Sequence, residues 1–368
     1  MKKILILLII IIFMVAMLSS EVEKIVNPDK PLKGQWHLKP KEVWAITSAG
    51  SDTLSRPEFV VAADGTLCVW DWKNKLSYIF DNKGKFKKAF GKRGEGPGEM
   101  RYHFNSFFIE DKLITADLFR LHYFTRDGEF LKSVPYLFVQ QEPHFFLNEN
   151  EFIAAPTLRL PEGKGEMTHV NLKTGQKKLL KEFEVLKKGK LRAGPQFNLV
   201  GLSPSIVMGY DDDNNRICYG INHSYTINAV DLSGNLVNTF SVKREKKKIT
   251  RKAKIKELKT LDPSGPVKKI AKRLPDEIVY FHRIQIVNGL IYVFAGDFGV
   301  YWENQSIDIF SPDGQYLYQT QFKPDDGLNI YFSAHGIWIN NDHLYVILED
   351  DEGEVSIVKY KISLPSTG

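Results

Sequence analysis

Short runs of β-forming residues recur along the chain, and in five places such a run ends at an Asp-Gly, Ser-Gly or similar turn. Alternation of hydrophobic and polar residues with period two is the pattern of a half-buried strand, and glycine supplies the positive φ of a hairpin turn. The turn glycines are Gly84, Gly128, Gly175, Gly234 and Gly314, at spacings of 44, 47, 59 and 80 residues. The pattern therefore predicts antiparallel hairpins repeated along the chain.

A second apolar strand occurs six times at a matching position in each repeat, and a further strand lies before it. The second strands are Leu67–Val69, Leu113–Thr115, Phe152–Ala154, Ile217–Tyr219, Ile291–Val293 and Leu344–Val346. The first strands are Phe59–Ala63, Phe104–Ile109, Phe145–Leu147, Ile206–Tyr210, Ile284–Val287 and Ile337–Ile339. Four short antiparallel strands every 40–50 residues are typical of a propeller blade.

The repeats predict an all-β fold: a single six-bladed β-propeller over residues 40–363, followed by a short tail at 364–368. The sixth repeat ends after Val355–Ile362 without a fourth strand, whereas Glu42–Thr47 is a strand without a blade. Pairing the two closes the ring and removes its exposed edges. Two stacked β-domains are the alternative, and the sixfold recurrence argues against them.

The N-terminus has the features of an export signal. Lys2 and Lys3 precede an unbroken apolar run, Ile4–Leu18, and Ser19 and Ser20 follow. The run is shorter than the about 20 residues of a spanning helix, so residues 1–20 are interpreted as a signal peptide and 21–39 as a linker. The alternative is an uncleaved anchor that tethers the protein to the inner membrane. We expect a periplasmic or extracellular location, and the lack of a cysteine after the run excludes a lipid-modified cysteine.

Composition excludes several classes of protein. The 368 residues are 43% hydrophobic and 26% charged, as in ordinary globular proteins. Two cysteines are too few for a disulfide scaffold. Cys68 and Cys218 lie at the same register in blades one and four, which face each other across a six-membered ring. We therefore expect two buried thiols rather than a disulfide.

The net charge of +6 conceals one strongly basic segment. Residues 243–273 contain 14 Lys and Arg against 3 Asp and Glu. Apolar residues at helical spacing predict two helices within an insertion at 243–275, between blades four and five, with Pro266 in the first turn of the second helix. The lysines are expected on the opposite, solvent-facing side of these helices.

Two interpretations of this insertion remain open. One is a solvated helical cap laid over a propeller face. The other is a docking surface for an acidic partner or an anionic phospholipid membrane. Nucleic acid is excluded as a partner because the protein is exported and no aromatic platform is interleaved with the charges. The candidate partner-binding residues are Lys246, Lys247, Lys248, Arg251, Lys252, Lys268, Lys269 and Lys272.

The segment Gly91–Met100 resembles a known linker. Its sequence, GKRGEGPGEM, is similar to the G-x-x-G-x-G-P-G-E linker of exported bacterial six-bladed β-propellers, relatives of the NHL-repeat and TolB-like propellers. Met100 stands where that pattern more often has Phe. The helical insertion also resembles theirs. The resemblance implies the propeller fold for the whole mature chain and says little about activity.

Other motifs favour structural roles. The glycine linker lacks the Lys-Ser/Thr and the helix of a phosphate-binding loop, so it is interpreted as a crossover between blades. Trp70-Asp71 occurs once and is not a WD repeat. In Asp211–Asn215, Arg216 stands where a calcium loop needs Gly, so a solvated hairpin turn is favoured.

A channel site is the remaining candidate. Glu58, His282 and His335 fall in one register near the start of the innermost strands of blades one, five and six. Two imidazoles and a carboxylate are ligands for a divalent metal, Zn or Ca. The alternative is that these residues form hydrogen bonds within a wet channel. His103 and His144 lie near the same rim, out of that register.

The leading functional hypothesis is a monomeric, non-enzymatic binding or scaffold module. It would engage a protein, peptide or glycan through the channel mouth and the helical cap. The competing hypothesis is a metal-dependent lyase or hydrolase with its site in the channel. Fold alone does not choose between them.

Overall fold

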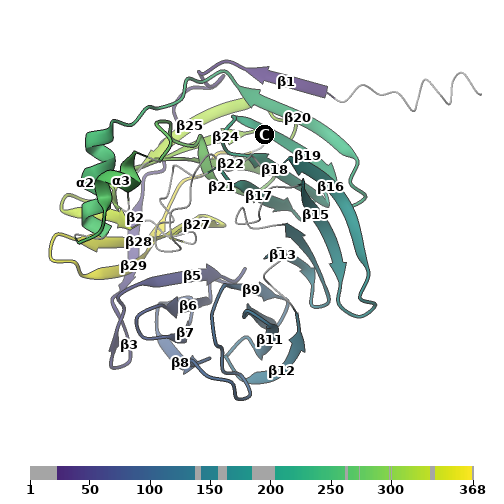
Figure 1. The fold of residues 1–368 in the computed structure, drawn as a ribbon, viewed down its shortest axis with the longest axis vertical. Helices are drawn as coiled ribbons and strands as arrows, with labels where there is room; N and C mark the ends of the chain where they lie inside the picture. The colour runs from purple at the N-terminus through teal and green to yellow at the C-terminus, as the bar shows by residue number, and fades with distance from the viewer. Residues whose placement is uncertain are drawn as a thin grey trace, which may run out of the picture.

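A computed structural model describes residues 23–136, 142–155, 164–184, 204–261, 264–272, 274–297, 299, 301–331 and 336–366. His335, one of the proposed metal ligands, lies outside these residues. The described chain forms a ring of six antiparallel β-blades (Figure 1). The all-β six-bladed propeller predicted from the repeats is therefore confirmed.

Five blades are built from consecutive segments of the chain, each running from the inner to the outer strand. Blade one comprises β5 (Pro57–Val61), β6 (Leu67–Asp71), β7 (Leu76–Phe80) and β8 (Phe86–Phe90), and blade two β9 (Asn105–Ile109), β10 (Lys112–Ala116), β11 (Arg120–Thr125) and β12 (Phe130–Pro135). Blade three comprises β13 (Glu142–Asn148), β14 (Glu151–Ala155), β15 (Lys164–Asn171) and β16 (Lys177–Glu184). Blade four comprises β17 (Ile206–Asp211), β18 (Arg216–Ile221), β19 (Thr226–Asp231) and β20 (Leu236–Val242), and blade five β21 (Phe281–Val287), β22 (Leu290–Ala295), β24 (Gln305–Phe310) and β25 (Tyr316–Phe322).

Blade six closes the ring with strands from both ends of the chain. Its strands are β27 (Ile337–Asn340), β28 (His343–Asp350), β29 (Val355–Lys361) and the N-terminal β2 (Lys41–Ile46). β2 pairs antiparallel with β29, which confirms the predicted closure. Two short strands, β23 (Tyr301–Trp302) and β26 (Leu328–Tyr331), extend this sheet from β28, and β3 (Ser48–Ala49) pairs with β4 (Asp52–Thr53).

The segment expected as a linker contains a strand of its own. β1 (Glu23–Asn27) lies parallel to β20 and adds a fifth strand to blade four. Asn27 fixes it in place, because its side chain donates to the Gly314 carbonyl at 2.9 Å and accepts from the Tyr316 amide at 2.9 Å. The N-terminal segment therefore ties blades four, five and six together.

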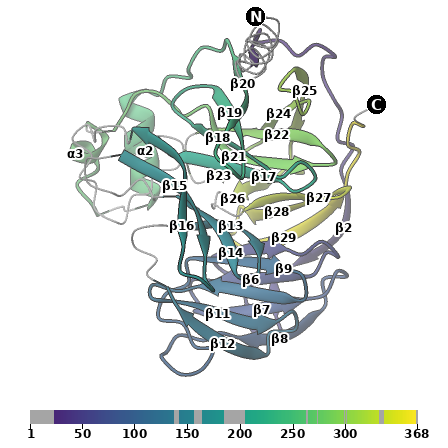
Figure 2. The same ribbon diagram turned by 90° about the vertical axis from the view of Figure 1, so that its right-hand side faces the viewer.

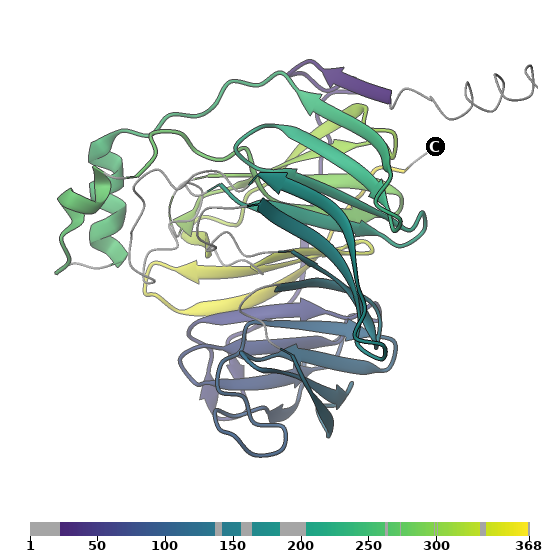
Figure 3. The same ribbon diagram turned by 45° about the vertical axis from the view of Figure 1, so that its right-hand side comes forward.

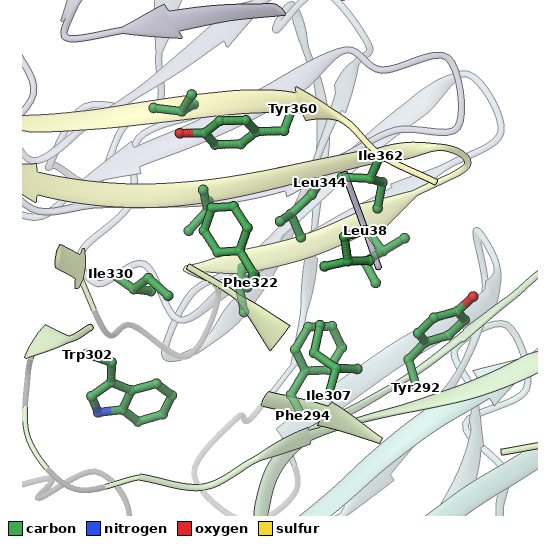
Figure 4. Packing of buried hydrophobic residues seen from close by; sticks show 14 of the residues in the cluster. Leu38, Tyr292, Phe294, Trp302, Ile307, Phe322, Ile330, Leu344, Tyr360 and Ile362 are labelled. Atoms are coloured by element: carbon green, nitrogen blue, oxygen red, sulfur yellow. The ribbon is translucent and has the colours of Figure 1, made fainter. Parts of the chain in front are cut away.

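The hydrophobic core lies between neighbouring blades. Figure 4 shows one cluster between blades five and six, where Phe294 and Ile307 face Leu344 and Tyr360. Each blade contributes alternate residues of its strands to such clusters, as the period-two pattern requires. Cys68 and Cys218 are buried and free, as expected.

The two ends of the blades differ in how their strands are connected. We call the end that carries the connections between strands one and two and between strands three and four the turn face. In blades one to five, its turns between strands three and four contain the five predicted glycines, all at positive φ. The opposite end, the loop face, carries the connections between strands two and three and between blades.

The basic insertion projects from the loop face. It contains α2 (Arg251–Leu261) and α3 (Val267–Ala271), and Figures 2 and 3 show both helices lying to one side of the blades. Within the described ranges, no helix is long and apolar enough to cross a membrane.

Candidate functional site

A pocket lies between the inner strands of blades one and two, β5 and β9. It is small: its cavity volume is about 10 Å³, room for about one water molecule or one hydroxyl group. Its lining combines one carboxyl group with aromatic, hydroxyl and thiol side chains: Glu58, Phe59, Val60, Cys68, Trp70, His103, Asn105 and Ser106. Two of the five channel candidates, Glu58 and His103, thus meet at one site.

Two buried aspartates position these residues. At the end of β6, Asp71 accepts hydrogen bonds from the amides of Ser55 and Arg56, at 2.7 and 3.1 Å. These residues immediately precede β5, which carries Glu58. Because a carboxylate that accepts several backbone hydrogen bonds holds its loop firmly, this contact fixes where β5 begins.

The same arrangement recurs in blade two. Asp117, which follows β10, accepts from the amides of Arg101 and Tyr102 at 3.0 and 3.2 Å, directly before His103. Burial tends to raise the pKa of Asp117, but hydrogen bonds from His122 and the backbone amides outweigh it and leave the pKa below its usual value. The aspartate is therefore ionised at neutral pH and holds the backbone before His103.

Among Glu58, His103 and Cys68, Glu58 is the pocket group whose pKa lies nearest to neutral pH. Burial raises the pKa of Glu58 to about 7, and a hydrogen bond from the Trp72 side chain opposes this rise without cancelling it. A carboxyl group with this pKa exchanges its proton near neutral pH. It can therefore accept or donate a hydrogen bond to a ligand there.

His103 is held in a neutral, buried state. Its ring stacks on Trp70 with a centroid separation of 4.7 Å, and its Nε2 lies 2.8 Å from the Ser106 hydroxyl oxygen. Burial lowers the pKa of His103 to about 3, opposed by the charge of Asp117. Burial also raises the pKa of Cys68 to about 12, although Ser106 hydrogen-bonds its thiol. Neither side chain is charged at neutral pH.

Two polar atoms of the pocket residues lack hydrogen bonds. The indole Nε1 of Trp70 and the Nδ1 of His103 are buried and have no partner among the described residues. Trp70 is 4% exposed and His103 is 3% exposed. An unsatisfied buried polar group costs about 1–3 kcal/mol, so such a pair in one pocket calls for an explanation.

Aromatic side chains lie on the segments next to the pocket. Trp72 is partly exposed and packs edge-on against Trp70, with ring centroids 5.9 Å apart. Tyr102 and Phe119 are 54% and 45% exposed, and the Asp117 carboxylate joins the segment that carries Tyr102 to the loop that carries Phe119. Exposed aromatic rings on segments next to a largely apolar pocket are typical of ligand sites.

Two other channel candidates, His282 and His144, do not line this pocket. At a β-bulge between Phe281 and Arg283, His282 hydrogen-bonds the Gln305 side chain at 3.0 Å and packs against Trp302. Burial lowers the pKa of His282 to about 3 and that of His144 to about 4. Among the described residues no group of three His, Cys, Asp or Glu is arranged to hold a metal. With His335 outside the described residues, the metal site at Glu58, His282 and His335 stays a prediction.

The proposed calcium loop is a turn, as the sequence favoured. Asp211 is fully buried and accepts a hydrogen bond from the Arg216 side chain at 2.7 Å. The Asp211 carboxylate therefore has Arg216 as its ion-pair partner within blade four.

The insertion lysines divide into paired and unpaired groups. Lys246 pairs with Glu277 at 2.9 Å and Lys247 lies 3.9 Å from Asp297, while Lys248 is exposed near Glu277. Arg251, Lys252, Lys268, Lys269 and Lys272 are exposed, as expected. Lys254 corrects that expectation: it is 1% exposed and donates to the Leu274 carbonyl at 3.0 Å and to Asp276. Its place in α2 on the same side as Leu258 accounts for this burial.

Several residues of the site were not predictable from the sequence: the two tryptophans, Ser106 and the two aspartates. In the sequence, Trp70-Asp71 stands out only as a dipeptide that does not repeat. One signal was available, because Asp71 and Asp117 follow the second strands of successive blades at corresponding positions. Their common role emerges only from the loops that they contact.

Comparison with known proteins supports the fold. The family model described as "DUF5128: 6-bladed beta-propeller" matches residues 51–273. No curated protein matches the chain. The solved structure of a DUF4221 family member from Bacteroides vulgatus is 13% identical, with a TM-score of 0.58, and the match covers 90% of this chain and 99% of that chain.

Two further solved structures are similar at lower levels. A Bacteroides fragilis protein whose name describes it as exported is 12% identical with a TM-score of 0.53, covering 93% of this chain and 100% of that chain. Virginiamycin B lyase from Staphylococcus aureus is 11% identical with a TM-score of 0.45, covering 87% of this chain and 99% of that chain. At these identities the two Bacteroides structures show the fold alone. The similarity to the lyase supports no inference about activity.

Proposed function

The chain belongs to the DUF5128 family of six-bladed β-propellers, and from this premise we propose that it is an exported module that binds a neutral glycan at the pocket between blades one and two. The observation that carries this proposal is the pair of buried nitrogens without hydrogen-bond partners among the described residues, Trp70 Nε1 and His103 Nδ1. Export is supported by the signal-like N-terminus and by the name of the Bacteroides fragilis neighbour.

A hydroxyl group has the chemistry that this pocket lacks. It accepts a hydrogen bond from the Trp70 N–H and donates one to the Glu58 carboxyl group, and it brings no charge into a buried site. An ammonium group would suit Glu58 but not the Trp70 donor. The aromatic faces of Trp72, Tyr102 and Phe119 suit the apolar face of a sugar ring, which favours a glycan over a peptide.

The acid–base properties of the pocket favour binding over catalysis. Glu58 alone among the pocket groups discussed has a pKa near neutrality, whereas His103 and Cys68 are too far from it to act as a base or a nucleophile. The competing proposal is a metal-dependent lyase or hydrolase that uses Glu58, His282 and His335. Stoichiometric zinc or calcium in purified protein, lost in the His282→Ala/His335→Ala variant, would favour that enzyme.

The binding proposal is tested with a glycan array, followed by calorimetry on the glycans that bind. Trp70→Phe keeps the ring but removes the N–H donor, so it should weaken binding about tenfold, the loss of one hydrogen bond in a buried site. Trp36→Phe is the matched control, because the Trp36 indole donates to the Ser363 carbonyl at 2.8 Å, outside the pocket.

Glu58→Gln separates the ligand classes. A neutral glycan should tolerate this change within about tenfold, since an amide still offers an acceptor, whereas a cationic ligand should lose nearly all affinity. Equal effects of Trp70→Phe and Trp36→Phe, or binding only to peptides, would contradict the proposal.

A further inference from the structure

The basic insertion is a small folded unit joined to the propeller by a two-stranded stem. The Ile249 amide donates to the Asp276 carbonyl at 2.8 Å, and the Ile278 amide donates to the Lys247 carbonyl at 2.9 Å. Above this stem, Leu258 of α2 packs with apolar residues of and beyond α3 in a cluster of its own. The unit therefore holds its two helices in a fixed arrangement without using the blade cores.

The buried Lys254 strengthens this arrangement. Its ammonium group crosses from α2 to the segment after α3, where it donates to the Leu274 carbonyl and to Asp276. Three residues further along the same side of α2, Glu257 lies against the loop at Gly299, where a methyl group would come within 3.0 Å of the Glu257 carboxylate. These contacts fix the direction in which α2 presents its remaining side chains.

Those remaining side chains, with three lysines at α3, form what we call the basic surface: Arg251, Lys252, Lys256 and Lys259 of α2, Lys268 and Lys269 of α3, and Lys272 directly after α3. All seven are exposed, and none forms an ion pair with a carboxylate in the described part of the chain. Lys252 and Lys256, like Lys268 and Lys272, are four residues apart. Like charges at this spacing destabilise a helix, so helix stability does not explain the pattern.

We propose that the basic surface docks the protein on a bilayer of anionic phospholipids. Residues 243–279 contain no aromatic residue, and where the structure describes this segment it holds none of the exposed large hydrophobic side chains. The surface therefore offers charge without a stacking platform for a sugar or an apolar groove for a peptide. Six of its seven cations are lysines, compact charges suited to diffuse attraction rather than bidentate recognition. A surface with many phosphate groups fits these properties, and the docking is independent of the ligand pocket.

Vesicle flotation tests this proposal with the chain from residue 21 onward, which retains every described element and omits the apolar N-terminal run. The protein should float with vesicles containing about 30% phosphatidylglycerol and not with phosphatidylcholine alone. Binding should disappear at about 0.5 M salt, because no apolar insertion supports it. Each lysine near an anionic surface strengthens binding about fivefold, so Lys252→Gln/Lys256→Gln/Lys259→Gln should weaken it about 100-fold.

Two matched variants serve as controls. Lys173→Gln/Lys177→Gln/Lys181→Gln removes three exposed lysines of blade three and should leave vesicle binding unchanged. Lys252→Arg/Lys256→Arg/Lys259→Arg keeps the charge and should retain binding. Equal losses from the two glutamine triples, equal binding to both kinds of vesicle, or binding to dextran sulfate without binding to anionic vesicles would overturn the proposal.

Discussion

The turn face and the loop face are built from the same strands but follow different rules. On the turn face, hairpins repeat with glycine at positive φ, and several of them pack against the next blade. The Gly314 turn of blade five meets Phe240 of blade four, and the Gly128 turn of blade two meets Phe90 of blade one. On the loop face the connections differ in length and content, and they carry the pocket and the insertion.

This difference separates two roles of the connections in a propeller. The turn face closes the strands tightly and joins neighbouring blades, so its residues are chosen by backbone geometry. The loop face accepts long insertions at little entropic cost and is free to carry chemistry. The contrast predicts that substitutions on the turn face lower the stability of the fold. Substitutions on the loop face should instead alter binding without lowering stability.

The largest expected effect comes from opening the ring, on which both faces depend. Truncation to residue 50 removes β1, β2 and the two-residue β3, exposes the edge of β29, and should lower the free energy of unfolding by several kcal/mol. Truncation to residue 30 removes β1 alone and should cost less. Chemical denaturation measures both. A truncation to residue 50 that unfolds like the chain from residue 21 would contradict the closure.

A glycine on the turn face gives the next largest effect. At Gly314 φ is +97°, and a methyl group there would come within 2.5 Å of the Phe240 ring. Gly314→Ala should therefore cost about 3 kcal/mol of stability, from backbone strain and the steric overlap together, without changing glycan affinity.

Gly175 provides the matched control on the same face. Its φ is +70°, but a methyl group there would meet nothing within 4 Å in the described structure. Gly175→Ala should cost about 1 kcal/mol, the backbone term alone. Thermal melts compare the two, and equal losses would show that contact between blades contributes nothing at Gly314.

The contrast also explains what the sequence could predict. Strands and turn glycines were predictable because their patterns are local. β1 was not, since its five residues pair with β20 more than 200 positions away and carry no local signal. The pocket was found only in part. Register counting identified Glu58 but not the aromatic and hydroxyl side chains around it, which other strands and loops bring to the pocket. The grouping of Glu58 with His282 and His335 stays a prediction.

On the loop face, replacing Glu58 should stabilise the protein above neutral pH, whereas replacing a turn glycine should destabilise it. The pKa of Glu58 is about 7 in the folded protein and 4.5 as its ordinary value, so the folded state binds its proton more tightly than the unfolded state. Its contribution is therefore favourable at low pH and is lost as the pH rises from 4.5 through 7. Because the side chain is partly exposed, the loss should be about 2 kcal/mol.

Glu58→Gln removes this penalty. The variant should match the wild type near pH 4.5 and be more stable above pH 7, measured by denaturation across this pH range. Glu149→Gln is the control on the turn face. The pKa of Glu149 is lowered by hydrogen bonds from Lys112 and Asn150, so its replacement should not stabilise the protein at any pH. A Glu58→Gln variant that is less stable than the wild type at pH 8 would contradict the burial of this carboxyl group.

The smallest effect on stability is expected from removing the insertion. Replacing residues 246–274 with a short Gly-Ser linker should change the free energy of unfolding by less than about 1 kcal/mol, because the unit has its own apolar cluster and its stem spans few residues. The same deletion should abolish vesicle flotation and leave glycan affinity unchanged. Aggregation of the deleted protein where the parent is soluble would show instead that the helices cover an apolar face.

If the loop-face pocket holds the ligand, the indole N–H signals of the six tryptophans report it directly. A ¹H–¹⁵N spectrum assigned with Trp-to-Phe variants is recorded while a glycan selected on the array is added. The Trp70 and Trp72 signals should shift at the affinity measured by calorimetry, while the Trp36 and Trp44 signals stay in place. A bound glycan that leaves Trp70 unchanged, or that shifts Trp44 beside the turn face instead, would contradict binding in this pocket.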